Sequence, residues 1–493
     1  MKKRLFIVIF AALLVMSACS QTNTPASTTQ TNIVQADLDD CLPDEKASVA
    51  DRGDASNSGD LISYDALDDA GDFASLGDAK SAAFSGASDI AINSAFDAAT
   101  GTADTFTESY SDIFIPYPDY DPIQAQAGTL TAGVWNDNVN FSFWQSLMGQ
   151  RQDWKSINEQ WGIYTTNRVL VRVLDSDGTP ISGAKVTLYK DNDVALWSNI
   201  SNAKGEAVLF NAINTLNGSQ PVKVVAEFNG VSAELSVTNT YTGASPLDIT
   251  LNTQSAGFVN NLDIMFMIDT TGSMGDELDY ITEELKDVVR RATEQTNKSI
   301  AVSPNFYRDE GDDYVVRAFN FSTNMDKVTD VLSQQHADGG GDYPEAVVEA
   351  MNSVLEHQWR SDSEKLLFLV LDAPAHYTQD NVNSLVASIQ QMSEMGIRVI
   401  PVASSGVDTE TEFLCRSFAI ATGGEYAFLT DDSGVGYGHL EPTIGNYDIK
   451  TLNDLLVDII TDFATVEKRT DYDTEHPDIN QVHEVPDNPV IDD

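Results

Sequence analysis

The stretch from residue 258 to about 466 alternates short apolar runs with longer segments of helical periodicity. The runs "LDIMFMID" (262–269) and "KLLFLVLD" (365–372) are continuous, as expected for strands buried on both faces of a sheet. Between them, segment 275–296 repeats its apolar residues every three to four positions, which is typical of an amphipathic helix. Repeated strand–helix units predict an α/β doubly wound domain with a mostly parallel sheet and helices on both faces.

Two of these predicted strands end in an aspartate, Asp269 and Asp372. Ligands of open parallel sheets bind at the carboxyl ends of the strands. Asp269 is followed by Thr271 and Ser273 at alternate positions of a glycine-containing loop, so several oxygens can face one point. Mg²⁺ takes such oxygen ligands together with water, and Ca²⁺ and Mn²⁺ are the alternatives. The sequence therefore predicts a divalent-cation site, although Asp269 and Ser273 could also simply stabilise a turn.

The pattern Asp-x-Thr-x-Ser after the first strand resembles the metal-ion-dependent adhesion site (MIDAS) of von Willebrand factor type A (VWA) domains, which have a Rossmann-like fold. The segments "DGGGDYPEAVVEAM" and "LVLDAPAH" look like the bacterial and hemicentin-like branch of that family. By position, the resemblance implies a metal held by Asp269, Thr271, Ser273, Asp342 and Asp372. Asp342 stands where integrin-like members have Thr, and it would add a third carboxylate. His376 is expected to make a structural hydrogen bond or to contact a ligand at the rim of the site.

The resemblance implies binding rather than catalysis, with the metal taking an acidic group of a protein partner, as in adhesion. The residues contain no Ser-His-Asp, His-Glu-x-x-His or phosphate-loop pattern, so we do not expect an enzyme. The alternatives are a metal-dependent hydrolase and an accessory subunit of an envelope enzyme complex. A hydrolase would need a general base beside the metal-bound water.

The N-terminal sequence predicts the localisation of the protein. Residues 1–18 combine a basic start, an apolar run and small residues, as in a secretory signal peptide. The sequence "SAC" ending at Cys19 resembles a bacterial lipobox, in which the cysteine carries palmitate and other acyl chains and anchors a lipoprotein to the membrane. That resemblance implies an outward-facing protein of the cell envelope or cell surface; an ordinary cleaved signal is the alternative.

Acidic segments of low complexity flank the folded region. Residues 19–122 predict a disordered stalk and residues 467–493 a disordered tail. Cys41 is expected to be exposed and Cys415 to be buried, both unpaired, although a disulfide between them stays open. The net charge of −48, from 76 acidic and 28 basic residues, argues against nucleic-acid binding.

Two further segments precede the α/β domain. Residues 123–165 are rich in tryptophan and predict a collar that packs on the next domain, with sugar stacking as the alternative. Residues 166–252 alternate short strands with Gly, Asn and Pro turns, which predicts a β-sandwich. This segment resembles carboxypeptidase-regulatory-like or transthyretin-like modules. Its "DSDG" turn, with Asp175 and Asp177, lacks a downstream Glu and is interpreted as a hairpin rather than a calcium loop.

Overall fold

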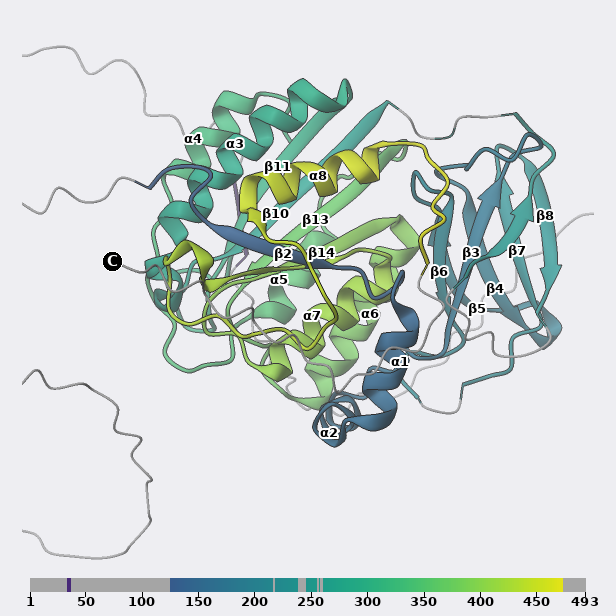
Figure 1. Ribbon diagram of the computed structural model, residues 1–493, viewed down its shortest axis with the longest axis horizontal. Helices are drawn as coiled ribbons and strands as arrows, with labels where there is room; N and C mark the ends of the chain where they lie inside the picture. The colour runs from purple at the N-terminus through teal and green to yellow at the C-terminus, as the bar shows by residue number, and fades with distance from the viewer. Residues whose placement is uncertain are drawn as a thin grey trace, which may run out of the picture. The chain divides into compact units, whose positions relative to one another are not determined.

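The computed structural model describes residues 33–36, 125–215, 218–237, 245–254, 257 and 260–472 (Figure 1). The predicted signal peptide, Cys19, Cys41, most of the predicted stalk and residues 473–493 of the predicted tail lie outside the described residues. Among the helices of the described part, none combines the length and the apolarity that a membrane span requires.

A nine-stranded sheet lies at the centre of the α/β domain, with the strand order β1-β12-β11-β10-β13-β14-β15-β2-β16. Five neighbouring strands run parallel, so their carboxyl ends meet at one edge of the sheet. These strands are β11 (Ser299–Tyr307), β10 (Asn261–Asp269), β13 (Ser363–Leu371), β14 (Ile397–Ala403) and β15 (Tyr426–Leu429). The predicted runs 262–269 and 365–372 correspond to β10 and β13.

Helices cover both faces of this sheet, as predicted (Figure 1). One apolar core lies under α3 (Leu278–Thr296), α4 (Met325–Ser333) and α8 (Leu452–Ala464). The other lies under α5 (Val347–Val354), α6 (Gln379–Met395) and α7 (Thr409–Thr422). Alternate residues of β10 enter the two cores: Phe266 belongs to the first and Met267 to the second. The domain is therefore a doubly wound α/β structure.

Two short strands extend the sheet from segments outside the predicted domain. β2 (Thr131–Trp135) lies antiparallel between β15 and β16 (Lys450–Thr451). At the other edge, β1 (Ile33–Ala36) runs parallel to β12 (Val316–Phe319). The four residues of β1 fall in the segment predicted to be largely disordered, and the edge of β12 supplies them with a backbone partner.

The tryptophan-rich segment, predicted as a collar on the domain that follows it, packs against the α/β domain instead, and its strand β2 is part of that domain's sheet. After β2 come α1 (Phe141–Gln150) and α2 (Gln152–Trp161). Trp144, Trp154 and Trp161 are fully buried, and the Trp144 ring stacks on Phe413 of α7 with centroids 6.2 Å apart. Buried indole rings offer no face to a sugar, so the stacking alternative fails for them.

The β-sandwich is inserted between α2 and β10, and it consists of two packed sheets. Their strand orders are β6-β3-β9 and β5-β4-β7-β8. The bounds are β3 (Arg168–Leu174), β4 (Lys185–Lys190), β5 (Val194–Ile200), β6 (Glu206–Phe210), β7 (Lys223–Phe228), β8 (Val231–Ser236) and β9 (Leu247–Thr250). In the "DSDG" turn, Oδ1 of Asp175 accepts hydrogen bonds from the backbone N–H groups of Asp177 (2.8 Å) and Thr179 (2.9 Å). The carboxylate therefore closes the turn, as interpreted from the sequence.

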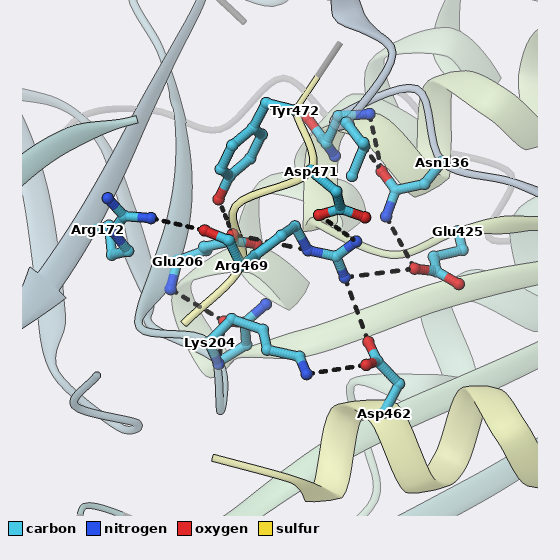
Figure 2. A network of polar contacts seen from close by, with 12 residues as sticks. Asn136, Arg172, Lys204, Glu206, Glu425, Asp462, Arg469, Asp471 and Tyr472 are labelled. Carbon is cyan, nitrogen blue, oxygen red and sulfur yellow. Dashed lines mark hydrogen bonds and ion pairs between the residues drawn. The ribbon is translucent and has the colours of Figure 1, made fainter. Parts of the chain in front are cut away.

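A polar network joins the sandwich, the α/β domain and the chain after α8 (Figure 2). Arg469 forms ion pairs with Glu206 of β6 (3.8 Å), Glu425 beside β15 (3.8 Å) and Asp462 of α8 (3.2 Å). Tyr472 donates a hydrogen bond to the same Glu206 carboxylate. The segment that follows α8 therefore ties the two domains together.

Candidate metal centre

Asp269 is the last residue of β10, and the hydrogen bonds of the next turn hold its carboxylate in place. Its side chain is fully buried. Oδ1 accepts hydrogen bonds from the backbone N–H of Thr271 (2.9 Å) and from the Thr271 hydroxyl (2.7 Å). The Thr271 and Ser273 hydroxyls are 3.1 Å apart. Oδ2 of Asp269 is buried without a hydrogen-bond partner, and this oxygen is available to a ligand.

Asp372 follows β13, the neighbour of β10 in the sheet, and it is also buried. Its Oδ1 has no hydrogen-bond partner. Burial, followed by the charge of Asp372, raises the pKa of Asp269 to about 7. Burial raises the pKa of Asp372 to about 6, although hydrogen bonding from the Ser273 hydroxyl opposes that rise. Two carboxylates therefore repel each other at this edge, and a cation between them would relieve the repulsion.

Glu345 is a third buried carboxyl group near the site, and the sequence reasoning missed it. Its backbone N–H donates to the carbonyl of Pro374 (2.9 Å), which holds it against the loop after β13. A Cβ at Gly340 would lie 3.4 Å from both Oε1 of Glu345 and Cβ of Thr271, so the two side chains flank this glycine. Burial and then the Asp269 charge raise the pKa of Glu345 to about 9. A Glu near a helix start is common in any protein, so no sequence pattern distinguishes Glu345 as a residue of the site.

Tyr307, at the end of β11, contributes a buried hydroxyl beside the same carboxylates. This hydroxyl has no partner at hydrogen-bond geometry. Burial and then the Asp269 charge raise the pKa of Tyr307 well above its ordinary value. The phenol therefore remains neutral and can act as a hydrogen-bond donor to Asp269 after a small shift of either side chain.

Asp342 and His376, the other two residues predicted for the site, lie apart from this group of buried oxygens. Asp342 is exposed, and among the described residues its carboxylate makes no hydrogen bond or ion pair with the other four predicted ligands. His376 pairs through Nε2 with Oδ1 of Asp309 at 2.7 Å, which is the expected structural hydrogen bond. The structure therefore brings together Asp269, Thr271, Ser273 and Asp372, adds Glu345 beside them, and leaves Asp342 at the surface.

The donor set fits a hard divalent cation. Within the parts of the chain that the structure describes, no three His, Cys, Asp or Glu side chains are grouped closely enough to hold one ion. Two carboxylates, two hydroxyls and water would supply the ligands instead, which suits the octahedral preference of Mg²⁺. Buried polar atoms without a partner are rare and costly. The unpartnered oxygens of Asp269, Glu345 and Asp372 are therefore the atoms that a bound cation could satisfy.

Comparisons with known proteins agree with the fold. A family model for the von Willebrand factor A domain matches residues 263–434. An ariadne-like RING finger protein of Acanthamoeba polyphaga mimivirus is 28% identical over 134 residues, which are 26% of this chain and 13% of that protein. Alpha-protein kinase vwkA of Dictyostelium discoideum is 28% identical over 123 residues, 24% of this chain and 19% of the kinase. This chain therefore spans less than a fifth of the length of either relative.

A solved structure is also similar, at lower identity. It is an aerotolerance-related membrane protein from Bacteroides fragilis carrying multiple mutations to serine, with 14% identity and a TM-score of 0.27. The match covers 41% of this chain and 99% of that one. The family match, the parallel sheet and the Asp-x-Thr-x-Ser loop at its carboxyl edge lead to one conclusion: residues 263–434 belong to a von Willebrand factor A domain.

Proposed function

We propose that this protein is a lipid-anchored binding protein of the cell envelope whose VWA domain holds a divalent cation in a MIDAS-like site. The cation would take a carboxylate from a protein partner into its open coordination position. The observation that carries the proposal is the set of buried, unpartnered carboxylate oxygens beside two hydroxyls at the carboxyl edge of the sheet. The envelope location rests on the signal-like N-terminus and the lipobox-like Cys19.

Each side chain has a distinct role in this proposal. Asp269 fixes the Thr271 hydroxyl through the 2.7 Å hydrogen bond, so that hydroxyl is oriented before any ligand arrives. Thr271 and Ser273 would bind the cation as neutral donors, and Asp269 and Asp372 would balance its charge. A divalent ion between two carboxylates is formally neutral and can still accept one more acidic oxygen. Mg²⁺ is the favoured ion, with Ca²⁺ and Mn²⁺ as alternatives. Asp342 as a further ligand stays a prediction of the resemblance.

A hydrolase is the weaker alternative, as Glu345, the buried acid that lies beside Thr271, illustrates. A general base must be ionised at the working pH and must reach the metal-bound water. Glu345 has a pKa raised to about 9, so it is protonated near neutral pH in the metal-free protein. A turnover screen with phosphoesters and peptides in Mg²⁺ or Mn²⁺ tests this alternative directly.

Calorimetry with Mg²⁺ tests the metal site. We expect Asp269→Ala to abolish Mg²⁺ binding while the far-UV circular dichroism stays that of the wild type, since its carboxylate hydrogen-bonds to Thr271 of the following loop. Asp380→Asn is the matched control, because this exposed carboxylate lies after β13, outside the predicted ligands. Wild-type Mg²⁺ binding by Asp269→Ala would place the site elsewhere and overturn the proposal.

A further inference from the structure

The carboxyl edge of the sheet is strongly acidic. The loops at this edge, 270–277, 308–313, 334–345, 372–380, 404–410 and 430–440, contain no lysine and one arginine, Arg308. Arg308 is buried and donates to the carbonyls of Thr270 (3.1 Å) and His336 (3.1 Å). Exposed carboxylates come from four of the six loops: Glu310, Asp313, Asp338, Asp342, Asp380, Asp431 and Asp432. The field outside the metal site is therefore negative.

Three exposed tyrosines stand on the same loops. Tyr343, Tyr377 and Tyr437 are 43%, 48% and 74% exposed, and they belong to the few large apolar side chains of the described residues that reach solvent. The Tyr343 hydroxyl donates to the carbonyl of Gly406 (3.2 Å) and the Tyr377 hydroxyl to that of Gln160 (3.0 Å). The rings of Tyr343 and Tyr377 are thus held in position with part of their surface uncovered, which lowers the conformational entropy lost when a partner binds.

Three histidines lie on these loops, His336, His376 and His439, too few to offset the charge of the carboxylates. His376 is paired with Asp309, as described above. His439 contacts two carboxylates, Glu277 through Nε2 (2.8 Å) and Asp431 through Nδ1 (2.8 Å). The acidic loops therefore keep an excess of negative charge even after these pairs form. A partner surface that is itself acidic would be repelled before its carboxylate reached the cation.

We propose that the partner presents a basic segment: one carboxylate for the cation, flanked by lysine or arginine. The inference rests on the proposed function and names the class of ligand. Exposed tyrosine faces bind guanidinium and ammonium groups through cation–π contacts. The surrounding carboxylates steer such a segment to the site and exclude uniformly acidic ones. The occupant is thus a cationic peptide of another protein.

Synthetic peptides test this on the full chain by fluorescence anisotropy. The basic Asp peptide has a central Asp between Lys and Arg residues. Three comparison peptides each differ from it in one feature: Asn replaces the central Asp, Ser replaces the flanking basic residues, or Glu replaces them. We expect the basic Asp peptide to bind at least about tenfold more tightly than the Ser-flanked one at low salt. This difference should shrink towards about 0.15 M ionic strength, where the Debye length is about 8 Å. Chelation should weaken the basic and the Ser-flanked Asp peptides and leave the Asn peptide unchanged.

The outcomes separate the two proposals. Equal affinity for basic and Ser-flanked Asp peptides overturns the present inference and leaves the metal site intact. Equal affinity of the basic Asp and Asn peptides, with no effect of chelator, overturns the metal-centred function and leaves basic recognition standing. Tighter binding of the Glu-flanked peptide, or no binding of any peptide, overturns the inference.

A variant locates the contact. Tyr437→Ala should weaken the basic Asp peptide about twofold to fivefold, as expected for an exposed cation–π contact, and should leave Mg²⁺ affinity unchanged. Val194→Ala is the matched control, because Val194 is a similarly exposed apolar residue on β5 of the sandwich. Suppose the wild type prefers the basic Asp peptide over the Ser-flanked one, but Tyr437→Ala binds the basic peptide as tightly as the wild type does. The carboxylates alone would then account for the preference, and the tyrosine part of the inference would be overturned.

Discussion

Arg416 of α7 offers a sharp test of how the tryptophan-rich segment is held. Its guanidinium is fully buried and forms two hydrogen bonds with Asp137, from Nε (2.9 Å) and Nη2 (2.7 Å). Nη1 donates to Glu412 (3.0 Å), and the group lies 4.9 Å from the Trp144 ring centre and 5.1 Å from that of Trp154. Replacing it by Met would leave two carboxylates buried without their cation.

Removing one partner of a buried ion pair costs about 3–5 kcal/mol, so we expect Arg416→Met to lose about that much of the free energy of unfolding. Domains of ordinary stability have about 5–15 kcal/mol in total, so the loss would be large. Urea unfolding followed by tryptophan fluorescence measures it, because Trp144 and Trp154 lie against this guanidinium.

The matched control is Arg290→Met on α3. Arg290 pairs with Asp287 and Glu294 one turn away, but its side chain is 58% exposed, so the expected loss is small beside that of Arg416→Met. The triple variant Arg416→Met, Asp137→Asn, Glu412→Gln should regain part of the stability, because no buried charge is left unpaired. A loss under about 1 kcal/mol in Arg416→Met would refute the reasoning.

Three further predictions concern the site, its neighbouring loop and the anchor. Burial alone would lower the pKa of His439, but Glu277 and Asp431 outweigh it and raise that pKa. His439 therefore stabilises the fold fully below about pH 6.5, and this contribution is lost as the pH rises through the raised value. Thermal melts of His439→Gln should show a deficit that shrinks with rising pH; a constant deficit would contradict the charged pair. Asp342→Thr should weaken Mg²⁺ affinity and, at saturating Mg²⁺, strengthen binding of a carboxylate partner, since it removes one negative charge; unchanged calorimetry would exclude Asp342 from the coordination sphere. Cys19→Ser should release the protein from membranes or leave uncleaved precursor, and membrane retention at unchanged gel mobility would argue against lipidation.

Local patterns predicted the regular elements well. The apolar face of α3 has helical spacing and is buried along its length, and Gly396 ends α6 in a left-handed conformation with φ 76°. The loop Asp269–Ser273 is recognisable as a candidate metal site because Asp269, Thr271 and Ser273 stand at alternate positions at the end of a buried strand.

What the sequence could not predict depends on distant partners. β2 is only five residues long, and its pairing with β15 is specified by a neighbour far along the chain. In the loop 339–345, spacing identifies a carboxylate near the site, but the direction of each side chain depends on the tertiary fold. Asp342 matches the family position and is exposed, whereas Glu345, three residues later, is buried beside Thr271.

The place of β2 in the sheet sets an order for folding during synthesis. The hydroxyls of Thr131 and Thr430 are 2.8 Å apart, yet 299 residues separate them along the chain. At about 5–20 residues per second, a ribosome needs about 15–60 s to make that stretch. The whole sandwich is synthesised within this interval and can fold, while β2 stays unpaired until β15 has been made. The VWA domain is thus completed last, and a chain started at residue 258 would leave the β15 edge open to pairing with other molecules.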